Sequence, residues 1–494
     1  MIYVCLEGHN FRYEVNELVK VFYFNKDINF IENKALTDTQ SLLIMSTLTN
    51  TINKVSVNTK VYEGKEIISS DNIDDISKID IKDNNDVKIA KLAIKQSIFD
   101  ALSKINSIKV PWGILTGIRP TKIVHNLLGK GVGKTDIMNI LIEEYKLKED
   151  KAKLTLDIAV VEKKVTDLVD NNKFSLYVNI PFCPTRCLYC SFLSNPISKY
   201  KELVDIYTDK LIYEIHKTKV LLKDKIIDTV YIGGGTPTSL PVENLNRIIK
   251  SIYESFNKNN IREFTVEAGR PDTITRDMLL MLRNNDIKRI SINPQTMCQK
   301  TLSLIGRKHT PQDIIDAFKL AKDMGFETIN MDIIVGLPEE GPKEIRATME
   351  EIMKLNPENL TVHTMAIKRA SRLKENLEKY SLAEQNTIEE MLSITKNYAS
   401  NMGMHPYYMY RQKQILGNYE NVGYSRTEKE CIYNILIMEE KQTIIAVGAG
   451  GITKIFYPKE NRIERVPNVK DLKEYIARVE EMIQRKEKYI KTLT

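Results

Sequence analysis

The sequence predicts an α/β protein, a partial (β/α)6 barrel between an amino-terminal α+β domain and a mostly helical carboxyl-terminal region. From residue 174 onward, short β-rich apolar runs alternate with longer amphipathic stretches, and polar or glycine-rich motifs follow several of the runs. This alternation is typical of parallel strands joined by helical crossovers. The chain has 494 residues, enough for about three domains. We expect these at 1–165, 166–375 and 376–494, the last covering the substrate.

Six apolar runs are the expected barrel strands. They lie at residues 174–180, 229–232, 264–267, 289–293, 328–335 and 360–365. Parallel barrels carry their functional residues at the carboxyl ends of the strands. Each conspicuous motif lies at or near such an end, so signals that are individually weak converge on one site.

Three cysteines follow the first expected strand. Cys183, Cys187 and Cys190 have the spacing C-x3-C-x2-C, with no further cysteine or histidine close behind. A structural zinc site takes four protein ligands, whereas a [4Fe–4S] cluster held by three cysteines keeps one iron open. The open iron can chelate the amino and carboxylate groups of S-adenosylmethionine (SAM). Three buried thiols or a redox motif are the alternatives.

Residues after the next strands predict a nucleoside site. The glycine-rich segment 233–237 allows a close main-chain approach to a ligand, although a tight turn without a ligand is the alternative. Glu267 ends the third strand and can accept hydrogen bonds from ribose hydroxyls. Gln295, Arg307 and Asp332 add an amide, a guanidinium group and a second carboxylate. Together they indicate a ring of polar groups around a nucleoside.

The cysteine motif resembles the signature of the radical SAM superfamily. Further strings resemble the oxygen-independent coproporphyrinogen III oxidase family over about residues 170–450; they are Tyr177, Ile-Pro-Phe-Cys183, Gly-Gly-Gly-Thr-Pro-Thr238, Val-Glu-Ala268, Ile-Ser-Ile-Asn-Pro-Gln-Thr296, Gly-Arg-Lys-His309 and Met-Asp-Ile-Ile-Val-Gly-Leu-Pro338. Segments 110–122, 407–413 and 417–423 resemble its HemZ branch, which carries an extra amino-terminal domain.

The resemblance implies two cofactors, a [4Fe–4S] cluster on the three cysteines and SAM. Tyr177, Tyr189, Gly234 and Glu267 would contact the cluster-bound SAM, with Gly235 in the same turn. The positions where the family holds a second SAM correspond to Thr236, Gln295, Arg307, Asp332 and Ala366. No side chain is identified as a catalytic acid or base.

The resemblance also implies a reaction in porphyrin biosynthesis. A deoxyadenosyl radical would abstract hydrogen from a propionate β-carbon of coproporphyrinogen III, and loss of CO2 and one electron would leave a vinyl group, twice. The expected partners are a porphyrinogen or heme-like small molecule and an electron donor such as flavodoxin or ferredoxin. Cations should hold the propionates. The candidates are Lys368, Arg369, Arg372, Arg411 and Lys413.

Two positions depart from the family pattern. Phe192 replaces a fourth cysteine, and Asn179 replaces the histidine of a Tyr-x-His-Ile-Pro string. A heme-binding chaperone of the same family, which also lacks the fourth cysteine, is therefore an alternative function. A radical SAM methylase or cyclopropanase and a non-catalytic iron–sulfur protein are further alternatives.

Composition predicts a cytoplasmic, monomeric protein without a membrane span or a nucleic-acid partner. The net charge of +7 is spread through mixed-sign runs, which favours a solvated surface. Six cysteines in 494 residues indicate a reducing compartment, and Cys5, Cys298 and Cys431 are expected to be packing thiols. The amino terminus has no basic leader followed by an apolar run.

The outer regions carry weaker signals. Segment 129–135 resembles a phosphate-binding loop, but Leu128 stands where that pattern needs glycine, so we expect the segment to end one helix and begin another. Trp112 lies in a segment expected to be a structural turn. Helices are expected at 382–402 and from residue 471 onward.

Overall fold

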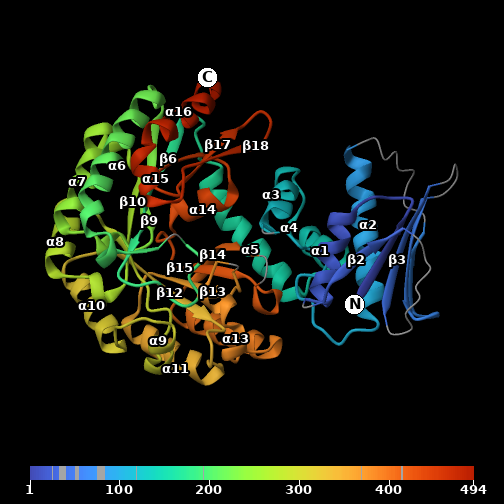
Figure 1. Ribbon diagram of the computed structural model, residues 1–494. Helices are drawn as coiled ribbons and strands as arrows, with labels where there is room; N and C mark the ends of the chain where they lie inside the picture. Colours follow the sequence, from blue (N-terminus) through green and yellow to red (C-terminus); the bar gives the residue numbers. More distant parts are fainter. Residues whose placement is uncertain are drawn as a thin grey trace. The chain divides into compact units, whose positions relative to one another are not determined.

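The computed structural model of the chain describes residues 1–24, 26–32, 41–50, 55–74, 84–117, 119–192, 194–368, 370–412 and 415–493. The described residues divide into two compact units, residues 1–157 and 158–494 (Figure 1). The three-domain division at residues 165 and 375 stays a prediction.

The first unit is an α+β domain, as predicted. Its five-stranded sheet has the order β2-β1-β3-β4-β5. The strands are β1 (Ile2–Glu7), β2 (Ile28–Ile31), β3 (Leu42–Asn50), β4 (Val55–Glu63) and β5 (Glu66–Ile73). The helices in this part of the chain are α1 (Arg12–Phe22), α2 (Asn84–Ser103), α3 (Thr121–Gly129), α4 (Lys134–Glu143) and α5 (Glu149–Thr166). Helix α5 continues into the second unit.

Helices α1 and α2 supply apolar side chains to the core of this sheet. Val15, Leu18 and Val19 of α1 pack in one cluster with Val57 and with Ile94 and Ile98 of α2. The spacings of three and four residues place such side chains on one helix face. Segment 129–135 ends α3 and begins α4, as predicted, and Trp112 is fully buried.

The second unit contains the predicted barrel. Six parallel strands occupy the expected positions: β6 (Lys173–Ile180), β9 (Ile226–Gly234), β10 (Glu263–Gly269), β11 (Arg289–Ile292), β12 (Thr328–Val335) and β13 (Asn359–Thr364). The short strands β7 (Phe182–Cys183) and β8 (Asn195–Pro196) pair with each other after β6.

Helices cover the outer side of the curved sheet (Figure 1). They are α6 (Lys201–Leu222), α7 (Val242–Ser255), α8 (Arg276–Asn284), α9 (Gln299–Leu304), α10 (Pro311–Asp323) and α11 (Pro342–Leu355). Helix α7 shows why they pack: Leu245, Ile248, Ile249 and Ile252 are buried and recur at helical spacing. The apolar stripe faces the sheet and leaves the other face polar.

The carboxyl-terminal residues extend the same sheet at both edges, giving the order β14-β15-β13-β12-β11-β10-β9-β6-β16-β17-β18. The added strands are β14 (His405–Tyr410), β15 (Asn421–Ser425), β16 (Thr443–Val447), β17 (Ile452–Tyr457) and β18 (Arg462–Pro467). The remaining helices are α12 (Arg372–Glu375), α13 (Gln385–Asn401), α14 (Ile432–Glu439), α15 (Leu472–Ala477) and α16 (Val479–Ile490). Helices at 382–402 and after residue 471 were predicted, whereas these five strands were not.

No helix among the described residues combines the length and apolar character needed to cross a bilayer.

Candidate active site

A cavity of about 660 Å³ opens at the carboxyl ends of the barrel strands. This volume is typical of ligand sites, which span about 300–1,000 Å³. Every residue predicted from the sequence to bind a cofactor or metal lines this cavity: Tyr177, Cys183, Cys187, Tyr189, Cys190, Gly234, Gly235, Thr236, Glu267, Gln295, Arg307, Asp332 and Ala366. The lining therefore joins residues that are spread over almost 190 positions of the chain.

The three cysteines lie on β7 and on the loop after it. The Cys190 backbone N–H donates to the Cys187 carbonyl at 3.2 Å, and the Leu188 N–H donates to the Ile305 carbonyl at 3.0 Å. The Thr236 hydroxyl lies 3.5 Å from Cys183 Sγ. These bonds hold the loop against the segment after α9 and present its thiols to the cavity.

The glycine-rich turn lies directly behind Cys183. Gly235 donates its N–H to the Ile180 carbonyl at 2.7 Å. A Cβ at Gly235 would collide with the Phe182 carbonyl and come within 3.0 Å of Cys183 Sγ. The turn therefore needs glycine for its own packing, and its main chain also faces the cavity.

Aromatic and acidic side chains form one wall. The Tyr231 hydroxyl donates to Glu267 Oε1 at 2.7 Å, and the Tyr231 ring stacks on Tyr433 with centroids 4.6 Å apart. Burial, with a smaller contribution from nearby Asp332, raises the pKa of Glu267 to about 7. Glu267 can thus change between acceptor and donor near neutral pH.

Another part of the lining contains Gln295, Arg307 and Asp332. Gln295 has a left-handed backbone, with φ +67°, and its N–H donates to the Asp332 carbonyl at 2.9 Å. A left-handed non-glycine residue is strained, so the surrounding bonds must hold it. Arg307 donates to the Asn293 carbonyl at 2.5 Å and lies against Cys187 and Tyr189.

A far wall on β13, β14 and β15 was not predicted in detail. The Tyr410 hydroxyl and His363 Nδ1 are 3.1 Å apart, and His363 Nε2 lies 3.7 Å from Asp332 Oδ2. Asn330 Nδ2 donates to Asp332 Oδ1 at 2.7 Å. Lys368 lines the cavity beside this wall, and burial lowers its pKa.

The structure corrects the predicted set of propionate-binding cations. Lys368 lines the cavity, but Arg372 is exposed and lies outside the lining. Arg411 is buried below the surface and donates to Asn418 Oδ1 at 2.7 Å, so it does not reach the cavity. Arg369 and Lys413 lie outside the described residues.

The other three cysteines do not line the cavity. Cys5 packs with Leu43 and Tyr62 in the amino-terminal sheet. Cys431 is buried at the start of α14, where its Sγ lies 3.2 Å from Glu263 Oε1. Cys298 precedes α9 and is partly exposed.

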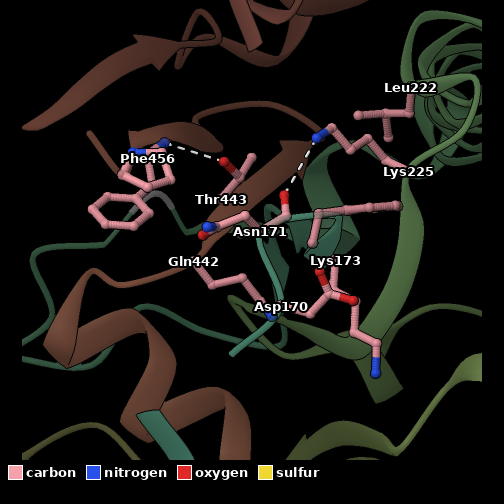
Figure 2. A pocket seen from close by; sticks show the side chains of 10 residues that line it. Asp170, Asn171, Lys173, Leu222, Lys225, Gln442, Thr443 and Phe456 are labelled. Atoms are coloured by element: carbon pink, nitrogen blue, oxygen red, sulfur yellow. Dashed lines mark hydrogen bonds between the residues drawn. The ribbon is translucent and has the colours of Figure 1, made fainter. Parts of the chain in front are cut away.

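A smaller cavity of about 80 Å³ lies at the amino ends of β6 and β16 (Figure 2). There the Phe456 N–H donates to Thr443 Oγ1 at 3.1 Å, and Lys225 Nζ donates to the Asn171 carbonyl at 3.3 Å. This is the end of a parallel barrel that is associated with stability rather than function.

Comparison with known proteins decides the family. Residues 177–352 match the radical SAM superfamily. The chain is 41% identical to the oxygen-independent coproporphyrinogen-III oxidase-like protein HemZ of Bacillus subtilis, over 84% of each chain. This chain belongs to the radical SAM superfamily and to the coproporphyrinogen-III oxidase-like family of HemZ. Other members of the family match over shorter lengths.

The shorter matches come from two kinds of protein. The heme chaperone HemW of Bacillus subtilis is 30% identical over 47% of this chain and 62% of its own. The oxygen-independent coproporphyrinogen III oxidase of Salmonella typhimurium is 32% identical over 39% and 42%. The structure of Escherichia coli coproporphyrinogen III oxidase (HemN) shares the fold, with a TM-score of 0.51 and 23% identity over 66% of this chain and 73% of that one.

Radical SAM proteins use a [4Fe–4S] cluster and SAM, and the cavity fits both. Cys183, Cys187 and Cys190 would ligate the cluster, and burial raises the pKa of the Cys190 thiol to about 11, so iron must displace the proton. The lining also offers carboxylate, amide and aromatic groups for a nucleoside. When bound, this pair supplies a carbon radical that abstracts hydrogen from a substrate.

Sequence reasoning missed three residues of the lining, Tyr231, His363 and Tyr410. It also missed Tyr433, which stacks on Tyr231. A signal for Tyr231 was present. Side chains two residues apart on a strand face the same side, and Gly233 belongs to the predicted glycine-rich segment. His363 lies on the expected strand 360–365, but no predicted site residue on that strand indicated which face lines the cavity. Tyr410 and Tyr433 belong to elements whose strand or helix position was not predicted.

Proposed function

We propose that this protein is an oxidoreductase that converts coproporphyrinogen III to protoporphyrinogen IX by radical-based oxidative decarboxylation. The observation that carries the proposal is the match to HemZ over 84% of both chains. The cavity supports it, because the lining continues past the cysteines to a wall with His363, Lys368 and Tyr410. That wall gives a large substrate hydrogen-bond donors and a cation.

The substrate side of the reaction needs positioning more than acid–base catalysis. Hydrogen loss from a propionate β-carbon leaves a carbon radical. Breaking the bond between the neighbouring carbon and the carboxylate then releases CO2, forms the vinyl group and passes one electron to an external one-electron acceptor. The carboxylate must already be ionised, so no protein base is required. Lys368 would hold a carboxylate, and Tyr231 and Tyr408 would limit water near the reacting carbon.

An electron donor such as flavodoxin or ferredoxin is part of the proposal. Phe192 follows Cys190 by two residues, lines the mouth of the cavity and has 72% of its surface exposed. An exposed aromatic side chain beside a buried redox site is suited to contact with a protein partner.

The heme-binding chaperone is the second candidate, because the chain is also similar to HemW. Anaerobically reconstituted protein, incubated with SAM, a reductant and coproporphyrinogen III, distinguishes the two by mass spectrometry. The enzyme should form the divinyl product and consume SAM. Stable stoichiometric binding of heme without a vinyl product would favour the chaperone.

The Lys368→Met variant tests whether Lys368 binds the substrate. The substitution should raise KM for coproporphyrinogen by about ten- to a hundredfold, since a charged carboxylate contact contributes about 1.5–3 kcal/mol. Arg372→Met is the matched control, because Arg372 is exposed outside the cavity lining. Equal KM values in both variants would remove Lys368 from substrate binding.

A further inference from the structure

A fully buried ion pair joins helices α6 and α16. Glu214 of α6 and Lys486 of α16 form a salt bridge, and neither side chain is exposed. Three further groups donate to the Glu214 carboxylate: the Tyr475 hydroxyl at 2.5 Å, Asn468 Nδ2 at 2.8 Å and the Gly448 N–H at 2.7 Å. Three helices, α6, α15 and α16, and the turn after β16 are therefore joined at one carboxylate.

The turn after β16 connects this carboxylate to Asn179. Asn179 Nδ2 donates to the Ala449 carbonyl. The Tyr207 hydroxyl donates to the Asn179 carbonyl at 2.5 Å. Gly448 has φ +94°, and a Cβ there would collide with the Asn179 carbonyl. The main chain and the amide of Asn179 are thus both fixed by groups outside β6.

The other side of the Asn179 amide faces the cavity wall. The Tyr177 hydroxyl donates to Asn179 Oδ1 at 3.1 Å, and the Tyr177 ring lies beside the stacked rings of Tyr231 and Tyr433, at centroid distances of 6.2 and 6.1 Å. A Cβ at Gly234 would collide with the same Oδ1. The amide oxygen therefore contacts both the tyrosine and the glycine-rich turn.

We propose that Asn179 is a positioning residue for SAM, which fixes the Tyr177 hydroxyl and the glycine-rich turn, and that the buried Glu214–Lys486 pair holds Asn179 in place from α16. An amide suits this position because it donates on one side and accepts on the other. The inference rests on the proposed placement of SAM against Tyr177. It extends the cofactor site to a helix near the end of the chain.

SAM affinity of the reconstituted full chain tests the role of Asn179. Asn179→Ala should raise the SAM dissociation constant by about tenfold, measured by calorimetry, and should alter the SAM-induced change in the cluster's EPR spectrum. Iron content should stay at the wild-type value. Asn179→Asp, of nearly the same size, should weaken binding as well, because its carboxylate faces the Ala449 carbonyl without a proton to donate.

Two comparisons make the result specific. Asn244→Ala removes another buried asparagine, which bonds Asp205 and Thr208 and lies outside the cavity, so it should leave SAM affinity unchanged. Tyr177→Phe should weaken binding, and adding Asn179→Ala should weaken it no further. If Tyr177→Phe leaves the SAM dissociation constant unchanged, the placement of SAM against Tyr177 is wrong. If Tyr177→Phe weakens SAM binding but the Asn179 variants do not, the positioning role of Asn179 is overturned.

The link to α16 has its own test. The double substitution Glu214→Gln with Lys486→Met removes both charges together, and Tyr475→Phe removes a single donor with less risk to folding. Each should raise the SAM dissociation constant several-fold with iron retained, and combination with Asn179→Ala should be less than additive. Full additivity, or wild-type SAM affinity in Tyr475→Phe and in the double variant, would overturn the link.

Discussion

Glu267 links the chemistry of the cavity to the pH dependence of stability. Its pKa is about 7 in the folded chain, mainly because of burial, and the usual value is 4.5. Between these values the folded state keeps the proton while the unfolded state loses it. The free energy of unfolding of the cofactor-free protein should therefore fall as pH rises from 4.5 to 7, by about 1–3 kcal/mol from this residue.

Urea denaturation of wild type and Glu267→Gln over this pH range measures the contribution. The difference between the two proteins should change with pH in the stated direction, and contributions from other groups, including Glu340 with its similarly raised pKa, cancel in the difference. A difference independent of pH would show that Glu267 ionises normally.

The cysteines give the second prediction at this scale. Alanine at Cys183, Cys187 or Cys190 should abolish the cluster absorbance and SAM cleavage, because a [4Fe–4S] cluster cannot be held by two thiolates. Serine at Cys5, Cys298 or Cys431 should leave iron content unchanged, since none of them lines the cavity. Iron retained after loss of all three loop cysteines would contradict the ligand set.

The sequence predicted cavity residues that lie on or after a recognisable strand or in a family motif, but not those that β14, β15 and α14 contribute. Glu267 and Asp332 lie on strands that are recognisable from their apolar runs. Arg411 shows the limit: a basic residue in a family-like segment was expected at the cavity, yet it is buried against Asn418. Charge alone does not tell on which side of a chain a side chain points.

At the scale of elements, Glu263 holds the start of α14. Its carboxylate accepts the backbone N–H groups of Ile432 and Tyr433 at 2.9 and 3.1 Å and pairs with Arg289 at 3.5 Å. Glu263→Ala should lower the free energy of unfolding by about 2–4 kcal/mol, because it leaves two N–H groups and a buried guanidinium group without this partner.

The Glu263→Ala substitution should also change the lining of the cavity. Helix α14 carries Tyr433 beside Tyr231 and supplies Asn434 to the cavity lining, so a displaced helix start should weaken SAM binding. Glu254→Ala on the exposed face of α7 is the control and should change the free energy of unfolding by less than 0.5 kcal/mol. Equal stability of the two variants would exclude the capping role.

The edge strands explain why the element prediction was incomplete. The six barrel strands alternate with helices, which makes each one recognisable. Strand β16 has only five residues, Thr443–Val447, and a short apolar run does not distinguish a strand from a buried helix. Its partner β6 precedes it by about 270 residues, so the pairing depends on the folded barrel.

At the scale of the whole molecule, each compact unit has its own apolar core. Ile94 lies in the amino-terminal core, and Ile248 is a buried residue of α7 in the second unit. Separate cores predict two unfolding transitions in calorimetry. Ile94→Ala and Ile248→Ala should each lower one transition, by a free energy of about 2–5 kcal/mol, and leave the other unchanged. If calorimetry shows one transition, and both substitutions destabilise it, the two units do not unfold independently.

The central claim is that the cavity directs a SAM-derived radical to a propionate of coproporphyrinogen III. The most direct measurement uses substrate deuterated at the propionate β-carbons, incubated anaerobically with reduced, reconstituted protein and SAM. The account predicts deuterium in 5′-deoxyadenosine together with the vinyl product. Unlabelled 5′-deoxyadenosine, or intact substrate beside tightly bound heme, would contradict it.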